Sequence, residues 1–229
     1  MTRVKICGLT TVEDAQAAAA AEADMIGFVF APSPRRVTPE EAARIAGALP
    51  LFVLRVGVFV DADYDTVCRT AAQARLDVLQ LHGSEDNTLL EQLRRAGHRV
   101  IKAVRVRDEA SLDGLADLAA DALLLDTASG AQAGGTGRPF DWRLACLAKE
   151  RLAQHGRRLP LIVAGGLRPD NVADCLRRVN PDGVDVSSGV ERLPGRKCPE
   201  RMREFVTIVR RYDVHEREGA GRPGDRAVW

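Results

Sequence analysis

The sequence predicts an α/β protein built as a single closed (βα)8 barrel. Short apolar runs alternate with longer amphipathic stretches along almost the whole chain, and about eight such units fit within residues 1–212. Strands that are separated by helices pair in parallel, and eight units of this size close into a barrel. An open doubly wound sheet is the alternative. It does not need eight near-equal units, and the first turn lacks its GxGxxG pattern.

The expected strands are short and are bounded by polar or glycine-rich residues. They are VKICGL (4–9), MIGFVF (25–30), FVLRVGVFV (52–60), VLQLHG (78–83), RVIKAVRV (99–106), ALLLDT (122–127), LPLIVAGG (159–166) and GVDVSSGV (183–190).

The expected helices lie between and after these strands and show helical spacing of their apolar residues. They are TVEDAQAAAAAE (11–22), TPEEAARIAGAL (38–49), DYDTVCRTAAQA (63–74), SEDNTLLEQLRRAG (84–97), DEASLDGLADLA (108–119), FDWRLACLAKERLA (140–153), RPDNVADCLRRV (168–179) and CPERMREFVTIVRR (198–211). Thr38 before Pro39, and Ser84 ahead of Glu85, are typical beginnings of helices.

Composition narrows the class of protein. The formal net charge of +1 gives no general attraction to nucleic acid or anionic membranes. No run approaches the ~18 apolar residues of a membrane span, and the N-terminus shows no signal-peptide pattern, so we expect a cytoplasmic protein. Five scattered cysteines without CxxC spacing predict reduced thiols and neither a disulfide nor a zinc framework. Residues 213–229 are charged and glycine-rich, which predicts a disordered tail behind a catalytic domain of residues 1–212.

Alternation along the strands predicts a polar barrel interior, whereas a purely structural barrel is filled with Val, Ile and Leu. Because closure makes the eighth strand the neighbour of the first, we predict that Lys5 and Asp185 pair inside the barrel within about 6 Å. The residues expected to point inward are Lys5, Cys7, Arg55, Gln80, His82, Lys102, Asp126, Asp185 and Ser187; those expected to point outward are Val4, Ile6, Val56, Val58, Leu79, Leu81, Leu123, Leu125, Val184 and Val186.

Small residues follow the last two expected strands, at the carboxyl ends where barrels of this kind hold their active sites. Gly165 and Gly166 end the seventh strand, and Ser187, Ser188 and Gly189 end the eighth. Their backbone N–H groups can approach phosphate oxygens closely, so we expect these five residues to bind phosphate. The alternative is two ordinary tight turns.

Cys7 and Asp126 end the first and sixth expected strands and face inward. A thiolate and a carboxylic acid on two sides of one substrate make a base and an acid for proton transfer. Lys5 is the neighbour expected to stabilise the thiolate. A buried packing role is the alternative for Cys7. His82 ends the fourth expected strand and is expected to be a histidine that makes one hydrogen bond; the alternative is that it lines the pocket. The other cysteines lie on or beside helices and are interpreted as packing residues.

Ordered motifs along about residues 3–211 resemble those of the phosphoribosylanthranilate isomerase family of tryptophan biosynthesis. They are KICGLT, GFVF with SPRRVTP after it, RVGVFV, QLHG, LLLDT with GGTGRPFDW after it, LIVAGGL, and VDVSSGVE with PGRK downstream. The resemblance implies a TIM barrel, a small phosphosugar substrate, and an Amadori rearrangement that turns an aminoaldose into an aminoketose, as an intramolecular oxidoreductase does. It implies no metal and no organic cofactor.

By this resemblance Cys7 takes the general-base position and Asp126 the general-acid position. Arg35 matches the arginine that binds the anthranilate carboxylate, while Arg36 replaces an aromatic residue, so we expect Arg35 or Arg36 to fill that role, with Arg35 favoured. The loop at residues 134–142 either closes over the site or is an ordinary flexible loop. The oligomeric state stays open between monomer and homodimer.

Three other functions remain as alternatives. A pentose-phosphate epimerase needs metal-binding histidines at several strand ends, and only His82 qualifies. An indole-glycerol-phosphate synthase needs a lysine acid beside an aromatic pocket, but the chain has only two tryptophans and two tyrosines. A non-catalytic receptor for a phosphate ligand would keep the glycine-rich turns and need neither Cys7 nor Asp126.

Overall fold

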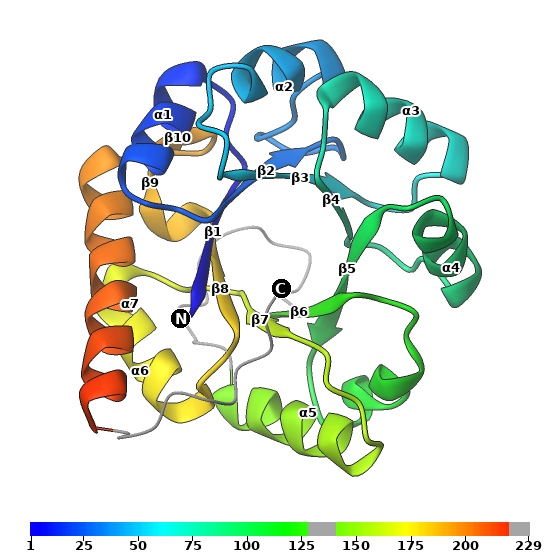
Figure 1. The fold of residues 1–229 in the computed structure, drawn as a ribbon, viewed down its shortest axis with the longest axis vertical. Coiled ribbons are helices and arrows are strands. Elements are labelled where there is room, and N and C mark those ends of the chain that lie inside the picture. Colours follow the sequence, from blue (N-terminus) through cyan, green and yellow to red (C-terminus); the bar gives the residue numbers. More distant parts are fainter. Residues whose placement is uncertain (128–140, 220–229) are drawn as a thin grey trace.

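The computed structural model describes residues 1–127 and 141–219, and within them eight parallel strands form a closed barrel (Figure 1). Each strand pairs with its neighbours in chain order, and the ring closes between β8 and β1. The strands are β1 (Arg3–Cys7), β2 (Met25–Val29), β3 (Leu54–Phe59), β4 (Val78–Leu81), β5 (Arg99–Val106), β6 (Ala122–Thr127), β7 (Leu161–Val163) and β8 (Gly183–Val186). The predicted fold class is confirmed.

The α-helices surround the strands on the outside of the barrel (Figure 1). They are α1 (Val12–Ala20), α2 (Pro39–Ala46), α3 (Tyr64–Ala74), α4 (Asn87–Arg95), α5 (Trp142–Gln154), α6 (Pro169–Val179) and α7 (Pro199–Gly219). As predicted, α2 begins after Thr38, whose hydroxyl accepts from the backbone N–H of Glu41 while the Glu41 carboxylate accepts in return.

The predicted helix beginning at Ser84 is wrong by two residues. Helix α4 is capped by Asp86, whose carboxylate accepts from the backbone N–H of Leu89. Glu85 turns inward and receives Lys102 Nζ at 2.7 Å, so the residue that resembled a first-turn acid is part of a buried ion pair.

The expected helix at 108–119 is not an α-helix. Two short 3-10 turns stand in its place, η1 (Ala110–Leu112) and η2 (Leu115–Asp117). Gly114 lies between them with a φ of 73°, a left-handed conformation that ends a right-handed helix. Two short turns therefore cover the barrel between β5 and β6 in place of an α-helix, and their Leu112 and Leu115 pack in the outer layer.

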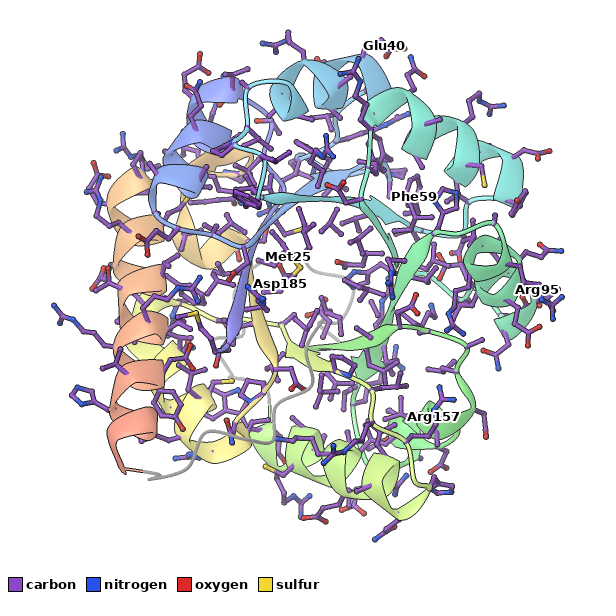
Figure 2. All side chains as sticks on the ribbon, viewed as in Figure 1. Met25, Glu40, Phe59, Arg95, Arg157 and Asp185 are labelled. Carbon is purple, nitrogen blue, oxygen red and sulfur yellow. The ribbon has the colours of Figure 1, made fainter. Side chains whose placement is uncertain are left out.

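Apolar side chains fill two layers. The larger one lies between the strands and the helices. The smaller lies inside the ring and consists of Met25, Val56, Ile101, Ala103, Ala122, Leu124, Ile162 and Ala164. Figure 2 shows Met25 and Asp185 within the ring of strands, whereas Glu40 and Arg95 lie on the outer helices.

The predicted direction of β3 is wrong. Val56 belongs to the inner apolar cluster, and Val58 shares its face of the strand. Phe59, of opposite parity, packs in the outer layer against Phe30, with ring centroids 5.2 Å apart. Arg55 therefore points out of the barrel and binds Asp77. Both faces of this strand are apolar, so alternation alone did not distinguish them.

The predicted inward direction of Lys102 is wrong for the same reason. Its neighbours Ile101 and Ala103 fill the inner cluster, which turns Lys102 outward. Its ammonium group donates to the Gly83 carbonyl and to Glu85, both at 2.7 Å. This buried charge is paired between the layers and takes no part in the barrel interior.

The predicted boundary between the domain and its tail, after residue 212, is wrong in its position, because α7 continues to Gly219. Buried Asp213 accepts from the backbone N–H and the hydroxyl of Thr2, at 2.7 and 2.9 Å. This contact ties the helix to the beginning of β1. Residues 220–229 of the expected tail lie outside the described residues.

In the described part of the chain, no helix combines the length and apolarity that a membrane crossing requires.

Candidate active site

A buried ion pair lies inside the barrel between β1 and β8. Lys5 and Asp185 are register partners, and Lys5 Nζ lies 3.0 Å from Asp185 Oδ1. The predicted pair is confirmed. Burial opposes the charge on Lys5, but the attraction of Asp185 and Cys7 outweighs it and raises the pKa of Lys5 above its ordinary value. The lysine therefore stays a cation beneath the carboxyl end of β1.

Cys7 ends β1 on the same inward face as Lys5. A Cβ atom added to its register partner Gly27 would lie 2.7 Å from Cys7 Sγ, so the missing side chain makes room for the thiol. Burial raises the pKa of Cys7 above its ordinary value, and Asp185 adds to that rise; Lys5 and Lys197 oppose it. The sulfur lies at the predicted place, with two cations near enough to stabilise a thiolate.

Asp126 lies at the carboxyl end of β6 and is joined to the end of β4 by His82. His82 Nε2 and Asp126 Oδ2 are 3.1 Å apart, and Gln80 Nε2 and His82 Nδ1 are 2.8 Å apart. An amide nitrogen only donates, so His82 Nδ1 accepts and His82 Nε2–H donates to the aspartate. The expectation that His82 makes a single hydrogen bond is wrong, since it holds the candidate acid in place.

The two arginines of the loop after β2 differ in their surroundings. Arg35 crosses directly over Gly8, where an added Cβ would lie 2.5 Å from Arg35 Cδ. Its Nε and Nη2 donate to the two carboxylate oxygens of Glu191 at 2.8 and 2.7 Å. Hydrogen bonding to Glu191 raises the pKa of Arg35. The Arg36 side chain is exposed. Of the two predicted residues, Arg35 is therefore the one beside Cys7.

The two glycine-rich turns after β7 and β8 touch each other. Gly165 and Gly166 have φ values of 80° and 71°, which side chains rarely adopt. A Cβ added to Gly189 would lie 2.0 Å from the Leu167 carbonyl oxygen, so only glycine allows this approach. A Cβ on Gly166 would meet nothing within 4 Å, which leaves open space beside the turn.

Ser187 and Ser188 lead from β8 into η3 (Ser188–Val190). Ser187 Oγ donates to the Cys7 carbonyl at 3.0 Å, which links the second turn to the end of β1. Ser188 is exposed. The five residues predicted to bind phosphate thus lie on one rim, next to the candidate base.

Glu191 and Lys197 belong to this site and were missed as functional residues by the sequence reasoning. Glu191 is the last letter of the motif VSSGVE, and Lys197 is the last letter of PGRK. Lys197 Nζ lies 2.8 Å from Glu191 Oε1, and both side chains are buried. An acidic residue directly after the glycine-rich turn of the last strand was the available signal. The expected covering loop at 134–142 lies outside the described residues, apart from Asp141 and Trp142.

Comparison with known proteins gives a consistent result over most of the chain. Residues 4–208 match the family model described as N-(5'phosphoribosyl)anthranilate (PRA) isomerase. The N-(5'-phosphoribosyl)anthranilate isomerase of Citrifermentans bemidjiense is 51% identical over 212 residues, which cover 92% of this chain and 98% of that protein. Its counterpart from Geotalea uraniireducens is 50% identical over 207 residues, covering 90% and 97%.

Solved structures agree with the sequence relatives. The phosphoribosyl anthranilate isomerase of Thermotoga maritima is 39% identical with a TM-score of 0.83, covering 92% of this chain and 99% of that one. A phosphoribosyl anthranilate isomerase in complex with reduced 1-(o-carboxyphenylamino)-1-deoxyribulose 5-phosphate is 38% identical with a TM-score of 0.80, at the same coverage. The chain therefore belongs to the N-(5'-phosphoribosyl)anthranilate isomerase family and is an isomerase of tryptophan biosynthesis.

Proposed function

We propose that Cys7 and Asp126 carry out the Amadori rearrangement of N-(5-phosphoribosyl)anthranilate to 1-(2-carboxyphenylamino)-1-deoxyribulose 5-phosphate. The supporting observation is that both side chains face the barrel interior at the carboxyl ends of their strands, one next to Lys5 and the other held by His82. Few purely structural barrels carry a buried thiol, a cation and an acid on one inner face.

The reaction needs one proton donor and one proton acceptor. Asp126 gives a proton to the ring oxygen of the ribose, the bond between C1 and that oxygen breaks, and the anthranilate nitrogen supplies its electron pair to form an iminium at C1. The Cys7 thiolate then removes the proton from C2, and the electrons of that bond form an enolamine. The enolamine becomes the ketone when C1 gains a proton and the hydroxyl on C2 loses one, so substrate and product are isomers.

The protein's own groups are sufficient for this sequence. The substrate nitrogen is the electron sink, so the proposal involves no metal and no organic cofactor. Lys5 lies beside the sulfur and stabilises its anionic form. A thiol of ordinary pKa is only a few per cent ionised at neutral pH, so this cation is part of the machinery.

Substrate binding uses two separated anion sites. Gly165, Gly166, Ser187, Ser188 and Gly189 surround the phosphate on the rim between β7 and β8. Arg35 receives the anthranilate carboxylate on the loop after β2, because a planar guanidinium suits a planar benzoate. The relative solved with a reduced form of the product carries the same two anionic groups on its ligand.

A fluorescence assay tests the proposal, because consumption of the anthranilate-bearing substrate changes its emission. We expect the wild type to turn over N-(5-phosphoribosyl)anthranilate, and the Cys7→Ser and Asp126→Asn variants to bind it with strongly reduced turnover. A wild type that binds the substrate and releases it unchanged would support a non-catalytic receptor instead. Normal turnover by both variants would refute the assigned roles.

We also propose that the chain is a cytoplasmic homodimer. Leu51 and Phe52 are 88% and 89% exposed in the turn before β3, an unusual exposure for two large apolar side chains in sequence. A relative from Thermotoga maritima is described as dimeric. Sedimentation velocity tests this, with the Phe52→Ser variant expected to sediment as a monomer; a monomeric wild type at micromolar concentration would refute it.

A further inference from the structure

Glu191 is a buried carboxylate that joins three segments around the site. It receives Arg35 from the loop after β2, Lys197 Nζ at 2.8 Å, and the backbone N–H of Gly195 at 3.3 Å. Lys197 and Glu191 lie on the small hairpin formed by β9 (Glu191–Leu193) and β10 (Arg196–Lys197). The Glu191 carboxylate thus links the loop that carries Arg35 to the β9–β10 hairpin, which directly follows the phosphate rim.

The geometry of the pair leaves part of Arg35 available. A guanidinium has five N–H groups, and Glu191 takes the Nε–H and one Nη2–H along its side. Both Nη1–H groups and the second Nη2–H remain, and together they form the end of the fork that accepts a second carboxylate. The side chain of Arg35 is 23% exposed while that of Glu191 is 5% exposed, so the fastened edge is the buried one.

The charges of this cluster also fit an anionic ligand. Two cations, Arg35 and Lys197, share one carboxylate, which leaves a net charge of +1. Burial opposes ionisation of Glu191, but hydrogen bonds from Arg35 and Lys197 outweigh it and lower the pKa of that carboxyl. Glu191 therefore remains an anion over the working pH range and does not compete for a proton with the reaction.

We propose that Glu191 is the positioning residue of Arg35. It binds the side of the guanidinium formed by Nε and Nη2, so that the end formed by Nη1 and Nη2 receives the aromatic carboxylate of the substrate. This inference rests on the proposed function, because it assigns a role within that same site. Glu191 acts through Arg35 and does not touch the reacting atoms. Gly8 completes the arrangement, since any larger residue there would displace the arginine stem.

The Glu191→Gln variant tests the proposal, because glutamine keeps the shape but loses the charge and one of the two acceptors. We expect KM for N-(5-phosphoribosyl)anthranilate to rise roughly tenfold while kcat stays within about twofold of the wild type. Inhibition by free anthranilate should weaken by a similar factor, and inhibition by inorganic phosphate should be unchanged.

The matched control is Glu200→Gln, which makes the same substitution at an exposed carboxylate paired with Arg192. It should leave KM and both inhibition constants at wild-type values. In an Arg35→Lys background, Glu191→Gln should have less effect on KM than in the wild type, because the partner that it positions is already altered.

Each outcome decides the matter. Equal weakening of anthranilate and phosphate inhibition would mean that Glu191 supports the fold generally, and would overturn the proposal, as would an unchanged KM. If Glu191→Gln does not fold, Glu191→Asp keeps the charge with a shorter reach and should still raise KM without affecting phosphate inhibition; if it affects both, the proposal fails. A wild type without turnover would refute the proposed function itself, whatever the variants do.

Discussion

The inside of the barrel consists of two unlike regions. Its middle is an apolar cluster that includes Met25, Val56 and Leu124, whereas the carboxyl ends of β1, β4 and β6 carry Cys7, His82 and Asp126. The Lys5–Asp185 pair lies at the level of Met25, which is the register partner of Lys5, so one ion pair reaches down into the apolar region. The first region serves packing and the second serves chemistry.

Removal of the Cys7 thiol should have the largest effect on kcat and should therefore distinguish the two regions most clearly. We expect Cys7→Ser to lower kcat by about a thousandfold, since a serine hydroxyl is not ionised at the working pH. Cys175→Ser is the matched control: that thiol is buried in α6, where burial raises its pKa to about 12, far from any role in proton transfer. Steady-state kinetics measures both, and loss of activity in the control would show that any buried cysteine change is disruptive.

Removal of Lys5 should affect both regions at once. Lys5→Met leaves Asp185 buried without a partner, which costs about 3–5 kcal/mol in the free energy of unfolding. Because Lys5 lowers the pKa of Cys7, its loss should also move the ascending limb of the kcat/KM profile to higher pH. Asp185 raises that pKa, so Asp185→Asn should move the limb to lower pH. Shifts in the same direction would contradict the assignment.

The contribution of Lys5 to stability should decline in alkaline solution. Folding raises the pKa of Lys5, so its contribution is complete below the ordinary value of 10.5 and declines as pH rises through the higher folded value. Urea unfolding of the wild type and of Lys5→Met tests this. The difference between their free energies of unfolding should be constant near neutrality and should shrink as pH rises above 10.5. A difference that grows with pH would contradict it.

A change in the apolar region should lower stability and leave kcat nearly unchanged, which is the opposite of what we expect for Cys7→Ser. Leu124→Ala removes a fully buried side chain two residues before Asp126 and should cost about 2–5 kcal/mol in the free energy of unfolding. We expect kcat within a few-fold of the wild type at a temperature where the variant is folded. Denaturant melts and kinetics on one sample provide the comparison, and a large loss of kcat would show that the two regions are not separable.

The smallest expected effect concerns the residue that orients the acid. His82→Asn removes the hydrogen bond to Asp126 and should lower kcat by roughly tenfold with little change in stability. His98→Asn, which alters a histidine near Cys68 away from the barrel mouth, serves as its control. Unchanged kcat in the first variant would mean that Asp126 holds its position without help.

Much of this site was predictable because closure of the barrel brings residues that are far apart in the sequence close together in space. Alternation on β1 and β8 placed Lys5, Cys7 and Asp185 correctly, since each of these strands has one polar and one apolar face. The same reasoning failed for Val56 and Lys102, because β3 and β5 have apolar residues on both faces. There, packing of Phe59 and Ile101 decides the direction, and packing partners are not visible in a single sequence.

Loop residues were the least predictable part. Glu191, at the beginning of β9, and Arg35, on the loop after β2, are 156 positions apart, and neither the parity of the barrel strands nor helical spacing relates their side chains. The expected helix at 108–119 failed because its apolar spacing was compatible with a helix while Gly114 broke the backbone. The position of Asp126 was predictable, whereas its contact with His82 depends on a side-chain orientation that alternation does not fix.

The pairing of β1 with β8 has a consequence for the order of events during synthesis. The lysine buried at residue 5 receives its partner only when residue 185 has left the ribosome, and Thr2 receives Asp213 later still. Through most of translation a nascent chain can pair its first strand only with β2, and closure of the ring with β8 is a late, long-range event. Shortening this protein from its carboxyl end past Asp213 would remove the carboxylate that binds both the backbone N–H and the hydroxyl of Thr2.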